Sequence, residues 1–211
     1  KSYIATGIDR MTGEAEASEF ETGSLFVVAR GATGKSAFAQ YASAKLNAPL
    51  WRTDTDLAVG GAALDSKLSR FVHEVEIEEV ITTFSNPLIV VDALDEAEVR
   101  VSAQSWNEFK DSLVKYACLG VRFIVCGRAL ATHDVKSRFE QECIQSGAWE
   151  LRPFNSSQQR DFIDASYLSK SGFTSVNSSA YRDARDSMLA NLSFPDAGRD
   201  RDNFAGYAPV L

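Results

Sequence analysis

A run of small residues that ends in lysine and serine has the spacing of a phosphate-binding loop, or P-loop. The run is Ala29-Arg30-Gly31-Ala32-Thr33-Gly34-Lys35-Ser36, with Ala29 in place of the usual first glycine. In such a loop, successive backbone N–H groups surround a β-phosphate, and the N-terminus of the following helix adds partial positive charge. We expect Lys35 to reach the β- and γ-phosphates of a nucleotide and the Ser36 hydroxyl to bind Mg²⁺. All eight residues are therefore candidates for nucleotide binding.

Three acidic residues follow a second apolar segment, residues 88–91. Asp92 comes directly after this segment, and Asp95 and Glu96 follow it closely. A carboxylate at the end of a buried parallel strand lies at the sheet edge where ligands bind, so we expect Asp92 to hold Mg²⁺ through its water shell, opposite Ser36. Glu96, with Asp95 beside it, is placed to orient or deprotonate a water that attacks the γ-phosphate. A purely structural alternative is that Asp95 and Glu96 stabilise the N-terminus of the next helix.

An arginine ends the next apolar segment. Arg128 closes the run FIVCGR, which again reads as the end of a strand. A guanidinium at this edge could bind the γ-phosphate with two hydrogen bonds. A solvated loop arginine is the alternative.

The segments that must position these residues alternate between two hydrophobic patterns. Continuous apolar runs predict buried strands at residues 24–30, 50–53, 87–92, 121–126 and 149–152. Apolar residues at helical spacing predict helices at 35–46, 65–84, 106–117 and 135–143. Strands that alternate with helices, without an obvious hairpin turn, predict an α/β fold with a mainly parallel sheet.

The pattern after Pro153 is helical only. Asn155 and Gln158 have the spacing of an N-terminal capping box, and apolar residues at helical spacing follow them. We expect a nucleotide-binding core at residues 1–152 and a small helical subdomain at 153–211 that is truncated at its end.

Composition limits the class of protein. The chain has 211 residues, of which 45% are hydrophobic and 24% charged, so it can bury one substantial core. Its formal net charge of −7 disfavours generic binding to nucleic acid or to anionic membranes. The apolar runs are much shorter than the ~20 residues of a membrane span. Three cysteines without paired spacing fit a reducing compartment, so we expect a cytoplasmic protein without a zinc site.

The segments ARGATGKS, LIVVDALDE and FIVCGR, followed by WELRPF and a helix, resemble the STAND class of P-loop NTPases, and NACHT-like domains in particular. Ala93, Asp95 and Glu96 match the small residue and second acidic pair that follow the metal-binding acid (Walker B) in NACHT-type proteins. Arg128 falls where that family has its first sensor arginine. The resemblance implies a three-layer P-loop NTPase fold of the ASCE type.

This resemblance also implies a function and partners. Proteins of this class are ATPase switches that hold ADP at rest, exchange it for ATP when a sensor region is engaged, and oligomerise to activate an effector in signalling or defence. The expected cofactors are ATP or ADP and Mg²⁺, and the expected partners are the other domains of a longer polypeptide and further copies of the chain. The residues implied in catalysis are Lys35, Asp95, Glu96 and Arg128.

Other functions remain open at this stage. A GTPase would need the guanine-reading motif Asn-Lys-x-Asp, which the sequence lacks. An AAA-type remodelling ATPase shares the same core, and a small-molecule P-loop kinase would use residues 51–56 on the substrate side. A domain that binds ATP as a structural element, with negligible turnover, is the non-enzymatic alternative.

Overall fold

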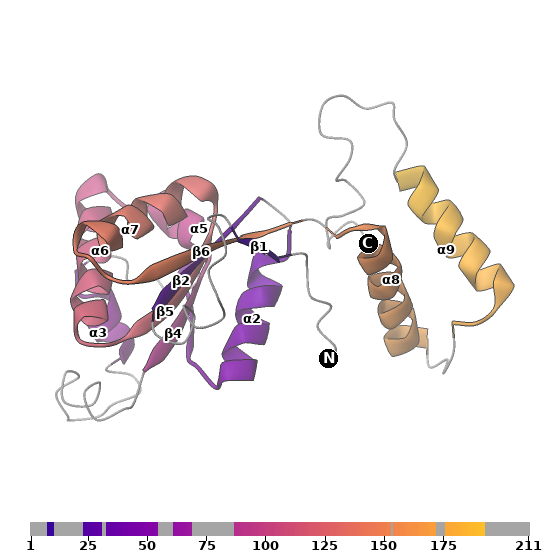
Figure 1. Ribbon diagram of the computed structural model, residues 1–211, viewed down its shortest axis with the longest axis horizontal. Coiled ribbons are helices and arrows are strands. Elements are labelled where there is room, and N and C mark those ends of the chain that lie inside the picture. The colour runs from indigo at the N-terminus through magenta and orange to yellow at the C-terminus, as the bar shows by residue number, and fades with distance from the viewer. Residues whose placement is uncertain are drawn as a thin grey trace. The chain divides into compact units, whose positions relative to one another are not determined.

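The computed structural model describes residues 8–10, 23–30, 33–54, 61–68, 87–152, 154–171 and 176–192 (Figure 1). The chain divides into two compact units. One consists of Arg10–Arg30 and Lys35–Glu150, and the other of Lys1–Asp9, Gly31–Gly34 and Leu151–Leu211. The first unit contains most of the sheet and the acidic candidate residues.

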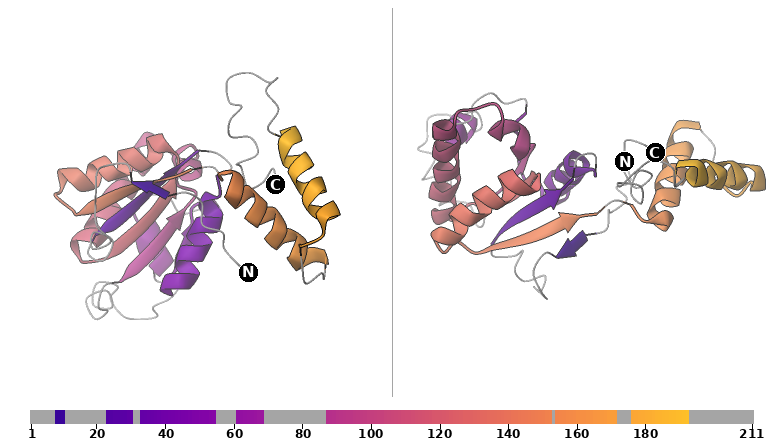
Figure 2. Two further views of the ribbon diagram at one scale, coloured as in Figure 1. Left: turned by 45° about the vertical axis from the view of Figure 1, so that its right-hand side comes forward. Right: turned by 90° about the horizontal axis from the view of Figure 1, so that it is seen from above.

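The strands form a six-stranded sheet in the order β1-β6-β2-β5-β4-β3. Their bounds are β1 (Ile8–Arg10), β2 (Ser24–Ala29), β3 (Leu50–Arg52), β4 (Leu88–Asp92), β5 (Arg122–Gly127) and β6 (Ser146–Leu151). The pairs β2–β5, β5–β4 and β4–β3 are parallel, and β6 runs beside β2 in the same direction (Figure 2). The predicted α/β fold with a mainly parallel sheet is therefore confirmed. The strand before the P-loop, β2, and the acidic strand, β4, are separated by β5, as in the expected ASCE arrangement.

The helices of the first unit are α2 (Lys35–Leu46), α3 (Ala63–Leu68), α5 (Leu94–Glu98), α6 (Ala103–Cys118) and α7 (Ala129–Gln141). Helix α2 has the predicted bounds, and α6 extends the predicted helix slightly at both ends. Of the helix predicted at 65–84, the described part is within α3, and residues 69–84 lie outside the described residues. Helix α7 begins six residues before the helix predicted at 135–143.

Side-chain alternation gives the sheet two different faces. On one face Phe26, Val91 and Phe123 belong to the main core, to which α6 and α7 contribute. The ring of Phe139 on α7 packs edge-on against Phe26, with ring centroids 5.2 Å apart. On the other face lie the intervening strand residues, and α2 packs there against β4 and β5. Burial of both faces explains why the strands read as continuous apolar runs.

In its described residues, the second unit contains two helices, α8 (Ser156–Ser171) and α9 (Ser179–Leu192). The predicted capping box is present, because the Asn155 side chain accepts from the N–H groups of Ser157 and Gln158 while the Gln158 side chain accepts from the Asn155 N–H. Asp164 of α8 accepts a 2.8 Å hydrogen bond from the Tyr181 hydroxyl of α9. The helical character predicted after residue 153 agrees with these elements, whereas the boundary at 152/153 and the truncated end stay predictions.

No helix within the described residues is long and apolar enough to cross a membrane.

Candidate functional site

Asp92, the last residue of β4, is a buried carboxylate without a partner. Its residue exposure is 1%, and neither carboxylate oxygen has a hydrogen-bond partner in the described part of the chain. A buried carboxylate costs several kcal/mol unless it is paired or binds a cation. Asp92 therefore has the properties of a ligand residue whose negative charge would be balanced by a bound cation.

Strand alternation places the Asp92 side chain on the face of the sheet that α2 covers. Val91 faces the main core and pairs in register with Val125, so Asp92 and Cys126 project from the opposite face. Helix α2 packs on this face and begins at Lys35. The structure thus brings the predicted phosphate-binding lysine and the predicted metal-binding acid to the same face.

The charges of Asp92 and Lys35 both influence the pKa of the Cys126 thiol. Burial raises its pKa well above the usual range, and the negative charge of Asp92 raises it further. The positive charge of Lys35 acts in the opposite direction. Cys126 is fully buried, so it is a core residue rather than a reactive thiol.

The predicted phosphate loop is described in part. Ala29 is buried at the end of β2, Arg30 is exposed, and the ammonium of Lys35 donates to the Arg30 carbonyl at 3.3 Å. Ser36, in the first turn of α2, is exposed. Gly31 and Ala32 lie outside the described residues, and nothing in the structure tests their predicted role.

The last two loop residues, Thr33 and Gly34, belong to the second unit. Thr33 is buried. Gly34 has φ +93°, a left-handed conformation that only glycine adopts without strain. The P-loop pattern requires glycine at this position, and the backbone gives a physical reason for it.

Asp95 and Arg128 form an ion pair at the ends of neighbouring strands. The Nε atom of Arg128 lies 2.9 Å from Oδ2 of Asp95, and the Arg128 backbone N–H donates to Oδ1 at 3.1 Å. The Asp95 side chain is 15% exposed and that of Arg128 66%. The sequence predicted a role for each residue, but not this contact between them.

Glu96, the next residue of the short helix α5, contacts a different arginine. Its carboxylate is 54% exposed and lies 3.6 Å from the guanidinium of Arg100. Arg100 also donates to the main-chain carbonyl of Asp54, and Asp54 pairs with Arg52 at 2.6 Å. Arg52 ends β3 in register with Asp92. The hydrogen bond that Arg52 donates to the Asp54 carboxylate raises the pKa of Arg52, and the negative charges of Asp54, Asp92 and Glu96 raise it further.

Sequence reasoning missed Arg52 and Arg100 as neighbours of the acidic residues. The one available signal for Arg52 was its position at the end of a short strand. Arg100 gave a second signal, because it lies four residues after Glu96, the spacing of an ion pair on a helix.

The donor set fits Mg²⁺ bound together with a nucleotide better than a metal bound by protein alone. In the described residues no group of three or more His, Cys, Asp and Glu side chains could hold a metal ion. Mg²⁺ is usually held by one or two carboxylates, water and substrate phosphates. Asp92 supplies one such buried carboxylate, and Ser36 supplies a hydroxyl at the start of α2.

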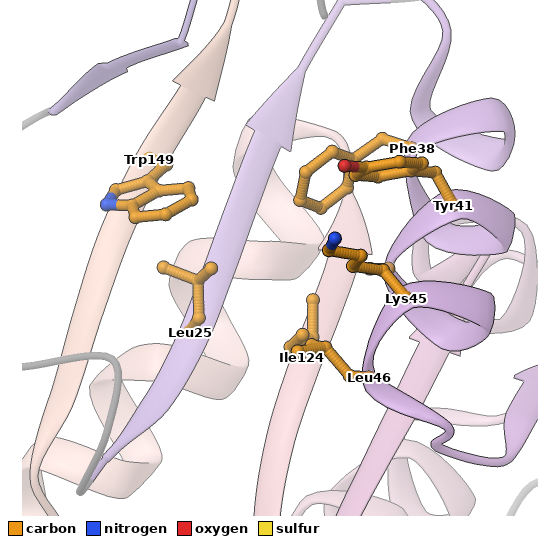
Figure 3. Close-up of a pocket in the computed structure, with 8 residues that line it drawn as sticks. Leu25, Phe38, Tyr41, Lys45, Leu46, Ile124 and Trp149 are labelled. Atoms are coloured by element: carbon orange, nitrogen blue, oxygen red, sulfur yellow. The ribbon is translucent and has the colours of Figure 1, made fainter. Parts of the chain in front are cut away.

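A separate apolar pocket of about 150 Å³ lies between α2 and the sheet (Figure 3). Phe38 and Tyr41 of α2 face Leu25 of β2 and Trp149 of β6 across it, and Leu46 of α2 lies beside Ile124 of β5. Ligand pockets for molecules of nucleotide size usually measure ~300–1,000 Å³. The small volume and apolar lining distinguish this pocket from the charged candidate site.

Comparison with known proteins gives structural likenesses only. No protein-family model and no curated protein matches the chain. Similar solved structures include Aeropyrum pernix ORC1 in complex with DNA, with 15% identity, TM-score 0.42, and 68% of this chain and 43% of that chain covered. Another is Drosophila ORC bound to GC-rich DNA and Cdc6, with 12% identity, TM-score 0.45, and 83% and 67% covered. Bacteroides sp. Pif1 in complex with ADP-AlF₄ matches with 13% identity, TM-score 0.33, and 82% and 46% covered. The chain thus spans less than half of the ORC1 chain.

These comparisons correct one expectation. The expectation of no generic nucleic-acid binding rested on the net charge of −7, and it is wrong as an exclusion, because the matched ORC1 and ORC structures are complexes with DNA. Net charge describes the whole chain and not its local distribution. Here Arg52 ends β3, Arg128 directly follows β5 and Arg100 follows α5, and each contacts an acidic residue or its main chain.

Proposed function

We propose that this chain is a Mg²⁺-dependent ATPase domain that binds ATP or ADP and hydrolyses ATP slowly, as the switch of a larger STAND or NACHT-like protein. The observation that carries the proposal is Asp92, a buried carboxylate with both oxygens unpartnered among the described residues, on the sheet face where α2 begins at Lys35. A cation held between this carboxylate and nucleotide phosphates would balance the buried charge. The resemblance of the three motifs to NACHT-like domains supports the choice of ATP and the switch role.

Each predicted residue then has a distinct part in the reaction. Asp92 and Ser36 hold the metal, and Lys35 binds the β- and γ-phosphates as a point charge. When bound, Mg²⁺ would neutralise the charge that develops on the transferred phosphoryl group. Glu96 orients the attacking water and accepts its proton, for which its exposed carboxylate is accessible. Arg128 binds oxygens of the γ-phosphate.

Such a switch would act through its change of conformation rather than through the amount of ATP that it hydrolyses. ADP-bound and ATP-bound states would differ in the contacts of Arg128, and hydrolysis would return the domain to rest. An AAA-type ATPase shares the core, and retention of ADP at rest separates the two. All three cysteines are free, which supports a reducing compartment such as the cytoplasm.

Calorimetric titration with Mg·ATP and Mg·ADP tests the binding part of the proposal. Lys35→Ala should weaken binding by about 100-fold, because it removes a charge-assisted contact to the phosphates. Lys45→Ala is the matched control, since it removes an exposed lysine near the other end of α2. Unchanged affinity in folded Lys35→Ala would contradict a phosphate site at this loop.

Release of inorganic phosphate tests the enzymatic part. Glu96→Gln should lower kcat by about 100-fold or more while ATP affinity stays within about twofold, because a glutamine can neither accept the proton nor bear charge. Glu98→Gln, in the same helix, is the control. Equal turnover of the parent and Glu96→Gln would favour the non-enzymatic alternative, in which the domain binds ATP only as a structural element.

A further inference from the structure

The carboxylate of Asp95 holds Arg128 at two points. One oxygen accepts from the backbone N–H of Arg128 at 3.1 Å, and the other lies 2.9 Å from Nε of the same residue. A carboxylate that binds both the main chain and the side chain of one arginine restricts the torsions between them. The Nε contact also leaves the two terminal nitrogens of the guanidinium without a partner in the described part of the chain.

The position of both residues in the fold explains the contact. Asp95 lies in the first turn of α5, which follows β4 through Ala93 in a left-handed conformation with φ +63°. Arg128 is the N-cap residue of α7, and its own side chain makes no capping hydrogen bond. Asp95 therefore supplies from a neighbouring helix the acceptor that the start of α7 lacks.

The same contact limits what Asp95 can do chemically. One of its oxygens accepts a hydrogen bond from the backbone N–H of Arg128, the other forms an ion pair with Nε of Arg128, and its side chain is 15% exposed. The neighbouring carboxylate of Glu96 is 54% exposed. Of the two, Glu96 is the one open to an attacking water.

We propose that Asp95 is a positioning residue, which acts on the γ-phosphate through Arg128 and not on the water. It fixes the guanidinium by Nε so that the two terminal nitrogens are presented, already oriented, to an oxyanion at the carboxyl ends of β4 and β5. This inference deepens the proposed function and rests on it. It also separates two adjacent acids that sequence analysis treated as one catalytic pair.

The test compares affinities for a triphosphate and a diphosphate. Calorimetry would measure Kd for Mg·AMP-PNP, a non-hydrolysable ATP analogue, and for Mg·ADP with the parent, Asp95→Ala, Arg128→Ala and the double variant. Asp95→Ala should weaken AMP-PNP binding by about tenfold and leave ADP within about twofold, because only the triphosphate offers the γ-phosphate. Arg128→Ala should have an effect at least as large, and the double variant should be no weaker than Arg128→Ala alone.

Two further variants control for stability. Asp95→Asn keeps an acceptor for the Arg128 N–H but loses the charge, so it should fold and show an intermediate loss for AMP-PNP. Asp111→Ala removes a similar ion pair, in which Asp111 of α6 contacts Arg138 of α7 at 2.8 Å, and should leave both affinities unchanged.

Four outcomes would overturn the positioning role or its basis. Additive losses in the double variant, or an unchanged ratio of the two affinities in both Asp95 variants, would show that Asp95 does not act through Arg128. A fall in kcat with unchanged AMP-PNP affinity would place Asp95 in the chemical step itself. A folded parent that binds neither nucleotide would instead refute the proposed function, and with it this inference.

Discussion

Thr53 holds the main-chain carbonyl of Asp92 with two hydrogen bonds, one from its hydroxyl at 2.7 Å and one from its backbone N–H at 3.1 Å. Thr53 is 2% exposed and follows directly after β3. The backbone of Asp92 is thus fixed to the neighbouring strand end while its carboxylate stays unpartnered among the described residues. Such an arrangement keeps a charged group in place without neutralising it.

Removal of the Thr53 hydroxyl should lower stability. Thr53→Ala deletes a buried hydrogen bond and a methyl contact, so we expect the free energy of unfolding to fall by about 1–2 kcal/mol. Thr53→Ser retains the hydroxyl and should lose less. Urea unfolding followed by circular dichroism measures both, and equal losses in the two variants would show that the hydroxyl contributes little.

Asp92→Asn should have opposite effects on stability and on ligand binding. Without ligand, the variant no longer buries an unpaired charge, so we expect unfolding to cost about 1 kcal/mol more than in the parent. With Mg·ATP at 100 times its Kd, the parent should gain ~2.7 kcal/mol from binding, and the variant should lose most of that gain.

Thermal or urea unfolding with and without Mg·ATP measures both effects of Asp92→Asn. Glu98→Asn, at a residue assigned no part in the site, is a control that should leave the ligand-dependent gain intact. A variant less stable than the parent in the absence of ligand would mean that the Asp92 carboxylate is already stabilised within the protein.

Local sequence patterns were sufficient to predict β2, β4 and the start of α8. Strands β2 and β4 were predicted within one residue of their bounds, because burial on both faces requires an unbroken apolar run. The capping box of Asn155 and Gln158 was predicted because its two partners are only three residues apart. Both signals lie within a single element and need no knowledge of tertiary contacts.

The pairing of Asp95 with Arg128 could not be predicted from the same patterns. The two residues are 33 positions apart, and they meet because β5 lies next to β4, which only the strand order decides. The early start of α7 was missed for a related reason. Its first turn carries Leu130, which is 84% exposed, so the apolar period that defines the helix becomes visible only further along the chain.

Asp134 should make stability depend on pH in the acid range. Its carboxylate on α7 accepts a 2.7 Å hydrogen bond from the indole N–H of Trp106 and lies 2.8 Å from the Lys110 ammonium, both on α6. Burial alone would raise the pKa of Asp134, but the hydrogen bonds from Lys110 and Trp106 outweigh it, so the pKa in the folded state is lowered. The folded state therefore favours the carboxylate, and the stability it contributes is present above the unfolded pKa of ~3.9 and lost as pH falls through the folded value.

Asp134→Asn tests this dependence. The Asp134 side chain is 42% exposed, so we expect the variant to be less stable than the parent by less than ~1 kcal/mol at pH 7. That deficit should shrink as the pH falls below about 4. Urea unfolding of both proteins at pH 7, 5 and 3.5 measures it, and a deficit that is constant over this range would contradict the assigned pKa direction.

Gly127, the last residue of β5, should not tolerate a side chain. A Cβ atom there would lie 2.6 Å from Oγ1 of Thr132 and 3.0 Å from Cβ of Leu94. Both neighbours are fully buried and Gly127 directly precedes Arg128, so Gly127→Ala should force α5 and α7 apart where Asp95 meets Arg128. We expect a loss of about 1–3 kcal/mol in the free energy of unfolding.

Thr132→Ala removes the closer of the two contacts. The Thr132 hydroxyl has no partner in the described residues, so this single change should cost little stability, and the double variant should recover part of the loss caused by Gly127→Ala. Urea unfolding of the parent, both single variants and the double variant gives a double-mutant cycle. Additive losses in this cycle would show that the close contact with Thr132 is not the reason for glycine at this position.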